Sequence, residues 1–361
     1  MDPETLRADI PACSSCAYLN TGASGPSPRR VVEAACEAQR RHEFDACETD
    51  HYVAAADRLD AARETIGGFI GCEPKDVALV ESTGDGISRA ANALDLGRDD
   101  TVVRTDLEHP SGVLPWRRSP ANVVTLGCPG GRLPIEEYKR VVEDATVVCL
   151  SSESWLHGTR LPVEEAVDIA HDAGAVVVVD AVQTVGQHPL DVTEWGADIV
   201  CASGHKWLLG PWGVGFLYAD PDSIDSFQPR HIGYRGVVEP SGSGLRYQPD
   251  ASRFELSTSG VAGYAGVIEA IETIEAIGLG TVESRIQRLT DRLKAGLGER
   301  LVSPEAYESG LVAFEAENPA ELVERLNEAG IVVRDLPSGD VRVSVHVFNT
   351  AEEIDRLLEA L

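Results

Sequence analysis

Lys206 ends the polar stretch "SGHK" (203–206), which follows an apolar run typical of a buried strand. It lies in "CASGHKWLLGP" (201–211), and only 4 of the 31 basic residues are lysines. The amine of lysine can lose a proton and attack a carbonyl to form a Schiff base, whereas the guanidinium of arginine stays protonated. Because this chain uses arginine almost everywhere else, we expect Lys206 to be a nucleophile rather than a surface lysine in a loop.

A carboxylate, Asp180, ends a second apolar run, "AVVVVDA" (175–181). An unpaired carboxylate at the end of a buried strand is costly, so Asp180 needs a cationic or hydrogen-bonding partner. A protonated pyridine nitrogen would be such a partner, and a cap or turn carboxylate is the alternative. Gln183 follows in the same turn.

Small residues fill the turn "STGDGIS" (82–88), between a predicted strand and a predicted helix. Backbone N–H groups at the positive end of a helix dipole bind phosphate well. This turn contains Thr83 and Gly84, and it lacks the spacing of both the nucleotide P-loop and the dinucleotide fingerprint. The sequence therefore indicates a phosphate site of another kind, or only a tight turn.

Polar residues follow two further predicted strands, and another candidate lies on a strand near the C-terminus. Glu108 and His109 come after "TVVRTDL", where His109 could stack on an aromatic ring or act as an acid or base. In "VRVSVHVF" (341–348), alternation places Arg342, Ser344 and His346 on one face of a strand. Arg342 could hold a carboxylate there, although a solvent-facing arginine is the commoner cause of such a pattern.

Helical and extended patterns alternate from about residue 29 to 220, which predicts an α/β domain with a mainly parallel sheet. "AVVVVDA" is apolar up to its aspartate and predicts a central strand covered on both faces. A long helix is expected from Val261 beyond Glu275, followed by a small α+β part whose last helix opens with a Thr350/Glu353 capping box. We expect residues 18–258 to form a large domain, and residues 1–17 and 259–361 a small one.

The charge balance is strongly acidic, with 59 acidic and 31 basic residues and a net charge of −28. Long-range repulsion then opposes binding to nucleic acid or to an anionic membrane. The excess is spread along the chain and resembles the surface of a protein adapted to molar salt, where screening is nearly complete beyond roughly 3 Å. We see neither a basic leader nor a run of roughly 20 apolar residues, so we expect a protein of a halophile's cytoplasm. Cys13 and Cys16 lack a second pair at zinc-ligand spacing, so no metal is expected.

These segments together resemble the class V aminotransferase family of enzymes that depend on pyridoxal 5′-phosphate (PLP), which have the type I fold. The resemblance runs from "YLNTGASGPSP" (18–28) to the end of the chain, and its most specific segments are "VVVDAVQTVGQHPLDV" and "SGHKWLLGPWGVGFLY". It implies a large domain with a mainly parallel sheet, a small C-terminal α+β domain, and a homodimer.

The resemblance also implies a role for each candidate residue. Lys206 would form the Schiff base and move the substrate proton, Asp180 would pair with the pyridine nitrogen, and Arg342 would bind the substrate α-carboxylate. The ring would be held by Gln183 and stacked on His109. The phosphate would be held by Thr83, the backbone of Gly84, Ser203 and His205, with Thr258 reaching the phosphate of the neighbouring subunit.

Three departures from the family pattern bear on the reaction. Gly84 stands where many relatives have a second threonine, and Trp155 stands where desulfurases often have an asparagine. The last cysteine is Cys201, so "VVRDLPSGDVRVSV" offers no thiol where desulfurases carry their persulfide-forming loop. We therefore predict a class V aminotransferase acting on a small α-amino acid, and a desulfurase of the persulfide type is disfavoured. The alternatives are a C–S β-lyase of the cystine or cysteine-conjugate kind, an amino-acid epimerase, and a non-catalytic relative that binds the cofactor.

Overall fold

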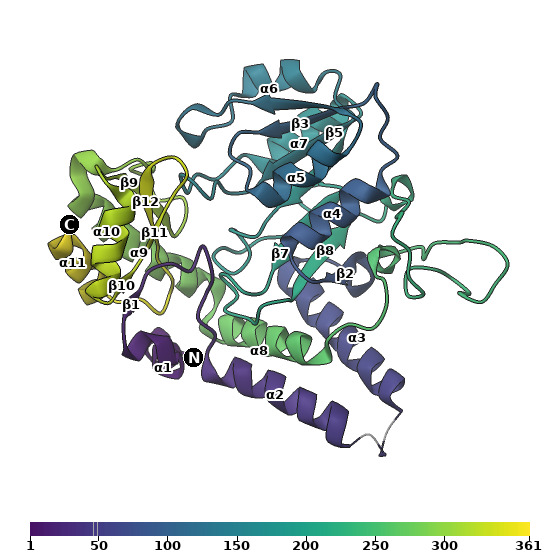
Figure 1. Cartoon of the computed structure of the whole chain (residues 1–361), viewed down its shortest axis with the longest axis horizontal. Coiled ribbons are helices and arrows are strands. Elements are labelled where there is room, and N and C mark those ends of the chain that lie inside the picture. Colours follow the sequence, from purple (N-terminus) through teal and green to yellow (C-terminus); the bar gives the residue numbers. More distant parts are fainter. Residues whose placement is uncertain (46, 49) are drawn as a thin grey trace.

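The computed structural model describes residues 1–45, 47–48 and 50–361. A seven-stranded sheet in the order β2-β8-β7-β6-β5-β3-β4 forms the centre of the larger part (Figure 1). All strands run parallel except β8, which pairs antiparallel with both of its neighbours. The strands are β2 (Val77–Val80), β3 (Thr101–Thr105), β4 (Asn122–Leu126), β5 (Val147–Ser151), β6 (Val176–Asp180), β7 (Ile199–Ser203) and β8 (Gly215–Ala219). The predicted α/β fold with a mainly parallel sheet is confirmed.

Helices cover both faces of this sheet, which explains why β6 is apolar along its length. Val178 faces a core with α4 (Thr83–Ala93) and α5 (Pro110–Arg118). Val177 and Val179 face the opposite core, which includes side chains of the remaining helices of this part. These are α3 (His51–Ile70), α6 (Ile135–Val142), α7 (Val163–Asp172) and α8 (Val261–Ile277), with α2 (Arg29–Phe44) packed against α8. The helix predicted from Val261 is α8.

A second, smaller sheet lies in the C-terminal part of the chain (yellow in Figure 1). Its strands are antiparallel in the order β11 (Arg334–Asp335), β12 (Asp340–Ser344) and β9 (Leu311–Glu315). Near the N-terminus, β1 (Ala17–Tyr18) pairs in parallel with β10 (Ile331–Val332). The helices of this part are α1 (Pro3–Asp9), α9 (Leu279–Leu297), α10 (Pro319–Glu328) and α11 (Ala351–Ala360), and α11 begins with the predicted Thr350/Glu353 capping box. Short 3-10 turns occupy Pro11–Ser14, Pro74–Asp76, Pro129–Gly131, Ile224–Ser226, Ala251–Phe254 and Gly298–Arg300.

The strand predicted over residues 341–348 ends earlier in the structure than its alternating pattern indicates. β12 ends at Ser344, so the expectation that His346 continues the strand beside Arg342 is wrong. The chain turns here because the N–H of His346 donates to Asn349 Oδ1 at 2.8 Å, while the ring Nε2 bonds to the carbonyl of Trp207 at 2.9 Å. His346 is therefore fully buried and supports the segment that carries Lys206.

None of the helices in the described part of the chain has the length and apolarity that crossing a membrane requires.

Candidate active site

One cavity of about 180 Å³ lies at the carboxyl ends of the central strands. It brings together every predicted site residue except Thr258, from segments far apart in the sequence. Thr258 is exposed in the loop before α8 and does not line this cavity. The predicted residues that line it are Thr83, Gly84, His109, Asp180, Gln183, Ser203, His205, Lys206 and Arg342.

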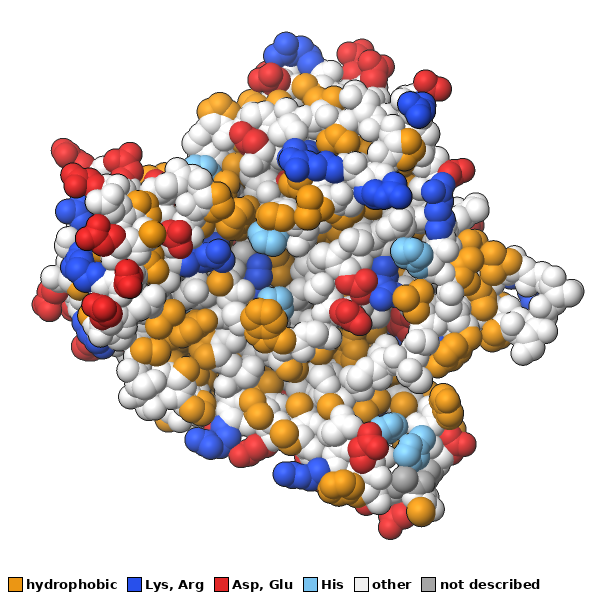
Figure 2. Space-filling view, in the orientation of Figure 1, with side chains coloured by type: hydrophobic (Ala, Val, Ile, Leu, Met, Phe, Trp, Pro, Cys, Tyr) orange, Lys and Arg blue, Asp and Glu red, His pale blue; other side chains and the backbone are white. Residues whose placement is uncertain are grey.

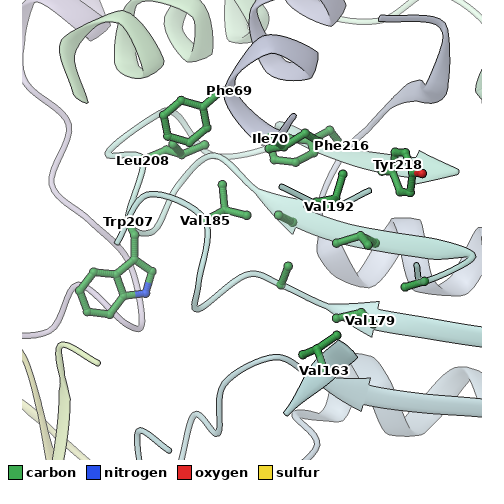
Figure 3. Packing of buried hydrophobic residues seen from close by; sticks show 14 of the residues in the cluster. Phe69, Ile70, Val163, Val179, Val185, Val192, Trp207, Leu208, Phe216 and Tyr218 are labelled. Carbon is green, nitrogen blue, oxygen red and sulfur yellow. The ribbon is translucent and has the colours of Figure 1, made fainter. Parts of the chain in front are cut away.

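Lys206 is held by its neighbours on both sides. It lies in the turn after β7, and the next two residues, Trp207 and Leu208, are fully buried in the core (Figure 3). On the other side, the N–H of Gly25 donates to the carbonyl of His205 at 2.7 Å. A side chain at Gly25 would not fit, since its Cβ would lie 2.2 Å from the carbonyl oxygen of Lys206. The turn is thus held between the hydrophobic core, which buries Trp207 and Leu208, and the N-terminal segment around Gly25.

The surroundings of Lys206 favour a free amine. Burial lowers its pKa to about 8, and the positive charges of Arg342 and Arg334 add to this effect, while Asp180 opposes it. Asp180 ends β6, and its Oδ1 accepts a hydrogen bond from the N–H of Val182 at 3.0 Å. Burial raises the pKa of Asp180, and the charge of Lys206 counters the shift. The cavity therefore holds a nucleophilic amine and a carboxylate ready for a cationic partner.

The N-terminus of α4 meets the end of β7 at the other side of the cavity. The N–H of Thr83 donates to Ser203 Oγ at 2.7 Å, and the two hydroxyl groups share a hydrogen bond of 2.7 Å. Ser82 caps the helix by accepting a hydrogen bond from the N–H of Asp85 at 3.1 Å. Hydroxyl groups and backbone N–H groups at a helix N-terminus form a suitable site for a phosphate.

His109 and Gln183 are fixed by protein contacts. His109 caps α5 through its Nδ1, which accepts a hydrogen bond from the N–H of Ser111. Its ring packs edge-on against the ring of Trp155, with the two ring centroids 5.2 Å apart. Burial lowers the pKa of His109 to about 4, so its ring is neutral at pH 7. The Gln183 amide donates to the Gly22 carbonyl at 3.1 Å and accepts from Trp207 Nε1 at 2.8 Å.

Arg342 is fully buried and only partly satisfied. Its Nη1 donates to the carbonyl of Trp155 at 2.8 Å, whereas its Nε and Nη2 are buried without a hydrogen-bond partner among the described residues. Buried donors without partners are costly, which indicates that an anion completes the site. Burial lowers the pKa of Arg342 to about 9, with a smaller contribution from the charge of Arg334.

Several residues in and around the site escaped the sequence analysis or were given no role in it, and three of them bear on its chemistry. Arg334 and Ser111 line the cavity without any preceding pattern that marks them. Glu108 does not line the cavity but precedes His109, which does, and its buried carboxyl group accepts hydrogen bonds from Thr105 Oγ1 and Ser151 Oγ, each at 2.6 Å. Burial raises the pKa of Glu108 to about 7, which limits the negative charge placed beside Asp180. Its position directly after the predicted strand "TVVRTDL" could have marked Glu108 as a residue near the site.

The residues present fit a PLP cofactor. The amine of Lys206, the carboxylate of Asp180 and the helix terminus at Thr83 are the three polar partners that its aldehyde, pyridine nitrogen and phosphate require. The orphaned donors of Arg342 lie in the same cavity and suit the carboxylate of an amino acid.

Comparison with known proteins identifies the family. The model of the family described as "Aminotransferase class-V" matches residues 17–357. The chain belongs to the class V aminotransferase family. It is therefore a PLP-dependent enzyme of this family, and the family acts on small amino-acid substrates.

The relatives carry a specific name. A protein of Methanothermobacter thermautotrophicus named "Probable cysteine desulfurase" is 30% identical, with 100% of this chain and 98% of that protein covered. The apo structure of a cysteine desulfurase from Thermococcus onnurineus has a TM-score of 0.91 at 28% identity, covering 99% of this chain and 97% of that one. A C-DES variant with glycine covalently linked to its PLP cofactor has a TM-score of 0.91 at 23% identity, covering 98% of both chains, and supports the fold.

These names correct our prediction of the reaction. We expected an aminotransferase, with a C–S β-lyase or an epimerase as the alternative, and we disfavoured a persulfide-type desulfurase. That prediction is wrong, because the curated relatives and the two solved structures from Thermococcus onnurineus and Escherichia coli are named cysteine desulfurase or probable cysteine desulfurase. We had based that prediction on the absence of a cysteine from "VVRDLPSGDVRVSV", the segment that contains β11 and β12. The absence of a thiol there does not decide the reaction of the family.

Proposed function

We propose that this protein is a PLP-dependent cysteine desulfurase, which removes the sulfur atom of L-cysteine and leaves alanine. The observation that supports it best is the convergence of Lys206, Asp180 and the unpartnered donors of Arg342 in one cavity. The names of the relatives point to cysteine as the substrate.

In this proposal each residue of the cavity has a defined task. Arg342 binds the α-carboxylate of cysteine through Nε and Nη2, which orients the amino acid. Lys206 holds the cofactor and, once released, takes the α-proton at Nζ, for which a lowered pKa is suited. Asp180 would pair with the pyridine nitrogen of the cofactor and favour its protonated form, and His109 would help to hold the ring. When bound, the cofactor supplies a ring that stabilises negative charge on the substrate carbons.

The phosphate is assigned to the N-terminus of α4. Thr83, the backbone of Gly84, Ser203 and His205 surround that end of the cavity. We assign Thr258 to the phosphate of a neighbouring subunit, since it is exposed and lies outside the cavity of its own chain. The proposal thus includes a homodimer, in which residues 18–258 hold the cofactor, and residues 1–17 with 259–361 form the small domain that supplies Arg342.

The test is a product assay with PLP-loaded protein, L-cysteine and an excess of dithiothreitol. The proposal predicts alanine and sulfide in equal amounts, and no turnover by Lys206→Ala. Lys139→Ala is the matched control, because Lys139 is exposed on α6, where it pairs with Glu136. Formation of 3-mercaptopyruvate, or of pyruvate with ammonia, would reject the proposed reaction.

A further inference from the structure

The position of the C-terminal sheet decides where Arg342 lies. Arg342 belongs to β12, whereas Asp180 ends β6 and Lys206 follows β7 in the central sheet. Figure 2 shows a hollow between these two parts of the molecule, with basic and histidine side chains gathered in it. Arg342 can orient a substrate carboxylate only if the C-terminal sheet keeps a fixed place beside the central one. The contacts between the two sheets therefore bear on substrate binding.

Two segments of the larger part hold the strands of the C-terminal sheet. In the first segment, the carbonyl of Trp155 accepts a hydrogen bond from Arg342 Nη1 at 2.8 Å. In the second segment, Gln187 Oε1 accepts a hydrogen bond from the N–H of Gly310 at 2.7 Å. Gly310 leads directly into β9, the strand that pairs with β12. Trp155 and Gln187 thus connect the C-terminal sheet to the larger part of the molecule.

One buried carboxylate, that of Glu153, joins these two segments. Glu153 is 1% exposed and stands two residues before Trp155, and its Oε2 accepts a hydrogen bond from Gln187 Nε2 at 3.1 Å. Its Oε1 forms an ion pair of 3.0 Å with Nε2 of His188, which is 2% exposed. Neither of these two atoms has a hydrogen-bond partner among the other groups that the structure describes. A carboxylate so far from water needs a cation beside it, and His188 is the buried group in that position.

The other side of the His188 ring faces the C-terminal part. Its Nδ1 forms a hydrogen bond of 2.9 Å with Oε1 of Glu283 on α9, and the ring packs edge-on against Tyr307 with the centroids 6.1 Å apart. Arg160 is a further charged group here. Its Nη2 donates to Glu283 at 2.8 Å and approaches His188 Nδ1, while its Nε lies 3.8 Å from Glu153. The Arg160 side chain is 43% exposed, so water screens its charge, whereas His188 is enclosed.

The charge of His188 follows from its two carboxylate partners. Burial by itself lowers the pKa of His188, but Glu153 and Glu283 raise it above its ordinary value, against the opposing charge of Arg160. The hydrogen bond from His188 lowers the pKa of Glu283 to about 2, so this carboxylate is ionised at neutral pH. A neutral imidazole ring could donate to only one of the two carboxylates. A protonated ring donates to both, one in the larger part and one in the C-terminal part.

We propose that protonated His188 is a positioning residue: it links Glu153 to Glu283 and thereby holds Arg342 where the α-carboxylate of the substrate binds. The inference rests on the proposed function, which assigns that carboxylate to Arg342. His188 does not line the cavity, so it acts through the Trp155 segment and β9 and not on the reacting atoms. The link is complete below the pKa of His188 in the folded protein and is lost as the pH rises through that value.

The experiment compares the binding of L-alanine and ethylamine to PLP-loaded protein, because these amines differ only in the α-carboxylate. The absorbance of the bound cofactor reports both dissociation constants. His188→Gln removes the charge and keeps a side chain of similar size. We expect it to weaken alanine binding about tenfold, the size of one charge-assisted contact, and to leave ethylamine binding unchanged.

Two further variants accompany His188→Gln. Glu283→Gln, at a partly exposed position, should weaken alanine binding by a smaller factor and decides the question if His188→Gln does not fold. His171→Gln is the matched control and should bind both amines normally. His171 also pairs with a carboxylate, Asp198 at 2.9 Å, but Asp198 precedes β7 and so lies at the edge of the central sheet opposite the cavity.

Steady-state kinetics with L-cysteine give a second readout. His188→Gln should raise the KM for cysteine about tenfold and change kcat by less than about twofold, as expected for a residue that acts on binding. Equal weakening of alanine and ethylamine binding would show that His188 only stabilises the fold, and would overturn the inference. Unchanged alanine binding in both His188→Gln and Glu283→Gln would overturn it as well.

The charge of His188 can be measured by ¹⁵N NMR of protein labelled in its histidine rings. The signals that are missing from His188→Gln assign the residue. We expect both ring nitrogens of His188 to be protonated at a pH of about 7.5, where an ordinary histidine is mostly neutral. A neutral ring at this pH would contradict the proposed link.

Arg342→Ala separates this inference from the proposed function. If Arg342→Ala loses the preference for alanine over ethylamine while His188→Gln keeps it, the role of His188 is rejected and Arg342 remains the substrate site. If Arg342→Ala keeps the preference, the assignment of the carboxylate to Arg342 is wrong, and the role of His188 is rejected with it. The product assay with L-cysteine tests the desulfurase reaction independently of both results.

Discussion

At the residue scale, Lys206 and Arg342 show how burial changes the chemistry of a basic side chain. Both are cations with a lowered pKa, about 8 for Lys206 and about 9 for Arg342, because removal from water disfavours their charged forms. For lysine this shift creates a nucleophile near neutral pH. For arginine, two buried donors have no hydrogen-bond partner among the residues that the structure describes, which favours binding of an anion.

The lowered pKa of Lys206 predicts the pH dependence of cofactor uptake. Below its folded pKa the amine is protonated and cannot attack the aldehyde of PLP. The rate at which apoprotein incorporates PLP should therefore rise with pH up to about 8 and then level off. Stopped-flow absorbance at a series of pH values measures this rate. If the rate continued to rise as the pH approached 10.5, the ordinary pKa of lysine, burial would not be lowering the pKa of this amine.

Replacement of Arg342 by alanine should weaken substrate binding. Loss of a two-point, charge-assisted contact costs about 1.5–3 kcal/mol, which corresponds to an increase of about 10- to 100-fold in the KM for cysteine. Steady-state kinetics of Arg342→Ala measure the change, with Arg117→Ala as the control at an exposed position. An unchanged KM would remove Arg342 from the substrate site.

At the element scale, strand ends and turns position the site. Asp180 and Ser203 end neighbouring parallel strands, β6 and β7, which places both side chains at one edge of the sheet. The turn after β7 carries Lys206, and the segment around Gly25 lies against it. The tight fit at Gly25 leads to the next prediction.

Gly25→Ala should distort the turn that carries Lys206. Its Cβ would lie 2.2 Å from a backbone oxygen that cannot easily move, so the substitution should cost about 1–3 kcal/mol and lower both PLP occupancy and activity. Gly68→Ala is the matched control, since no atom lies within 4 Å of its added Cβ in α3, and alanine should stabilise that helix by up to about 1 kcal/mol. Thermal unfolding and the absorbance of bound PLP report both effects. Equal behaviour of the two variants would contradict this role of Gly25.

The sequence predicted those elements whose local pattern agrees with their environment. The apolar run of β6 revealed a strand buried on both faces, and the polar residues after each run marked the edge where ligands bind. Arg334 had no such signal, because β11 has two residues and its pairing with β12 is set by tertiary contacts. His346 was misplaced for a related reason. Its alternating pattern continues beyond Ser344, but hydrogen bonds to Trp207 and Asn349 end the strand.

At the scale of the whole molecule, charge distribution distinguishes the cavity from the surface. The chain carries a net charge of −28, yet the cavity is lined by Lys206, Arg334 and Arg342 against one carboxylate, Asp180. An acidic exterior repels anions at long range, whereas the cavity attracts them at short range. Salt weakens the long-range repulsion more than the attraction inside the cavity, because exposed charges are screened more than buried ones.

The acidic surface predicts that salt stabilises the protein. Raising KCl from about 0.1 to 1 M shortens the screening length from about 10 to 3 Å, which reduces repulsion among the exposed carboxylates. The Tm and the retained activity should both rise over this range, as measured by thermal scans and residual activity assays. Full activity and an unchanged Tm in dilute buffer would contradict adaptation to high salt.

The central claim is that the cavity around Lys206 is the PLP site, and the chain offers a direct test because it has only 4 lysines. Borohydride reduction of the PLP-loaded protein makes the bond between cofactor and amine permanent, and peptide mass mapping then locates it. The account predicts the cofactor on the peptide that contains Lys206 and none on peptides with Lys75, Lys139 or Lys294. A label on one of those three lysines, or no label at all, would contradict it.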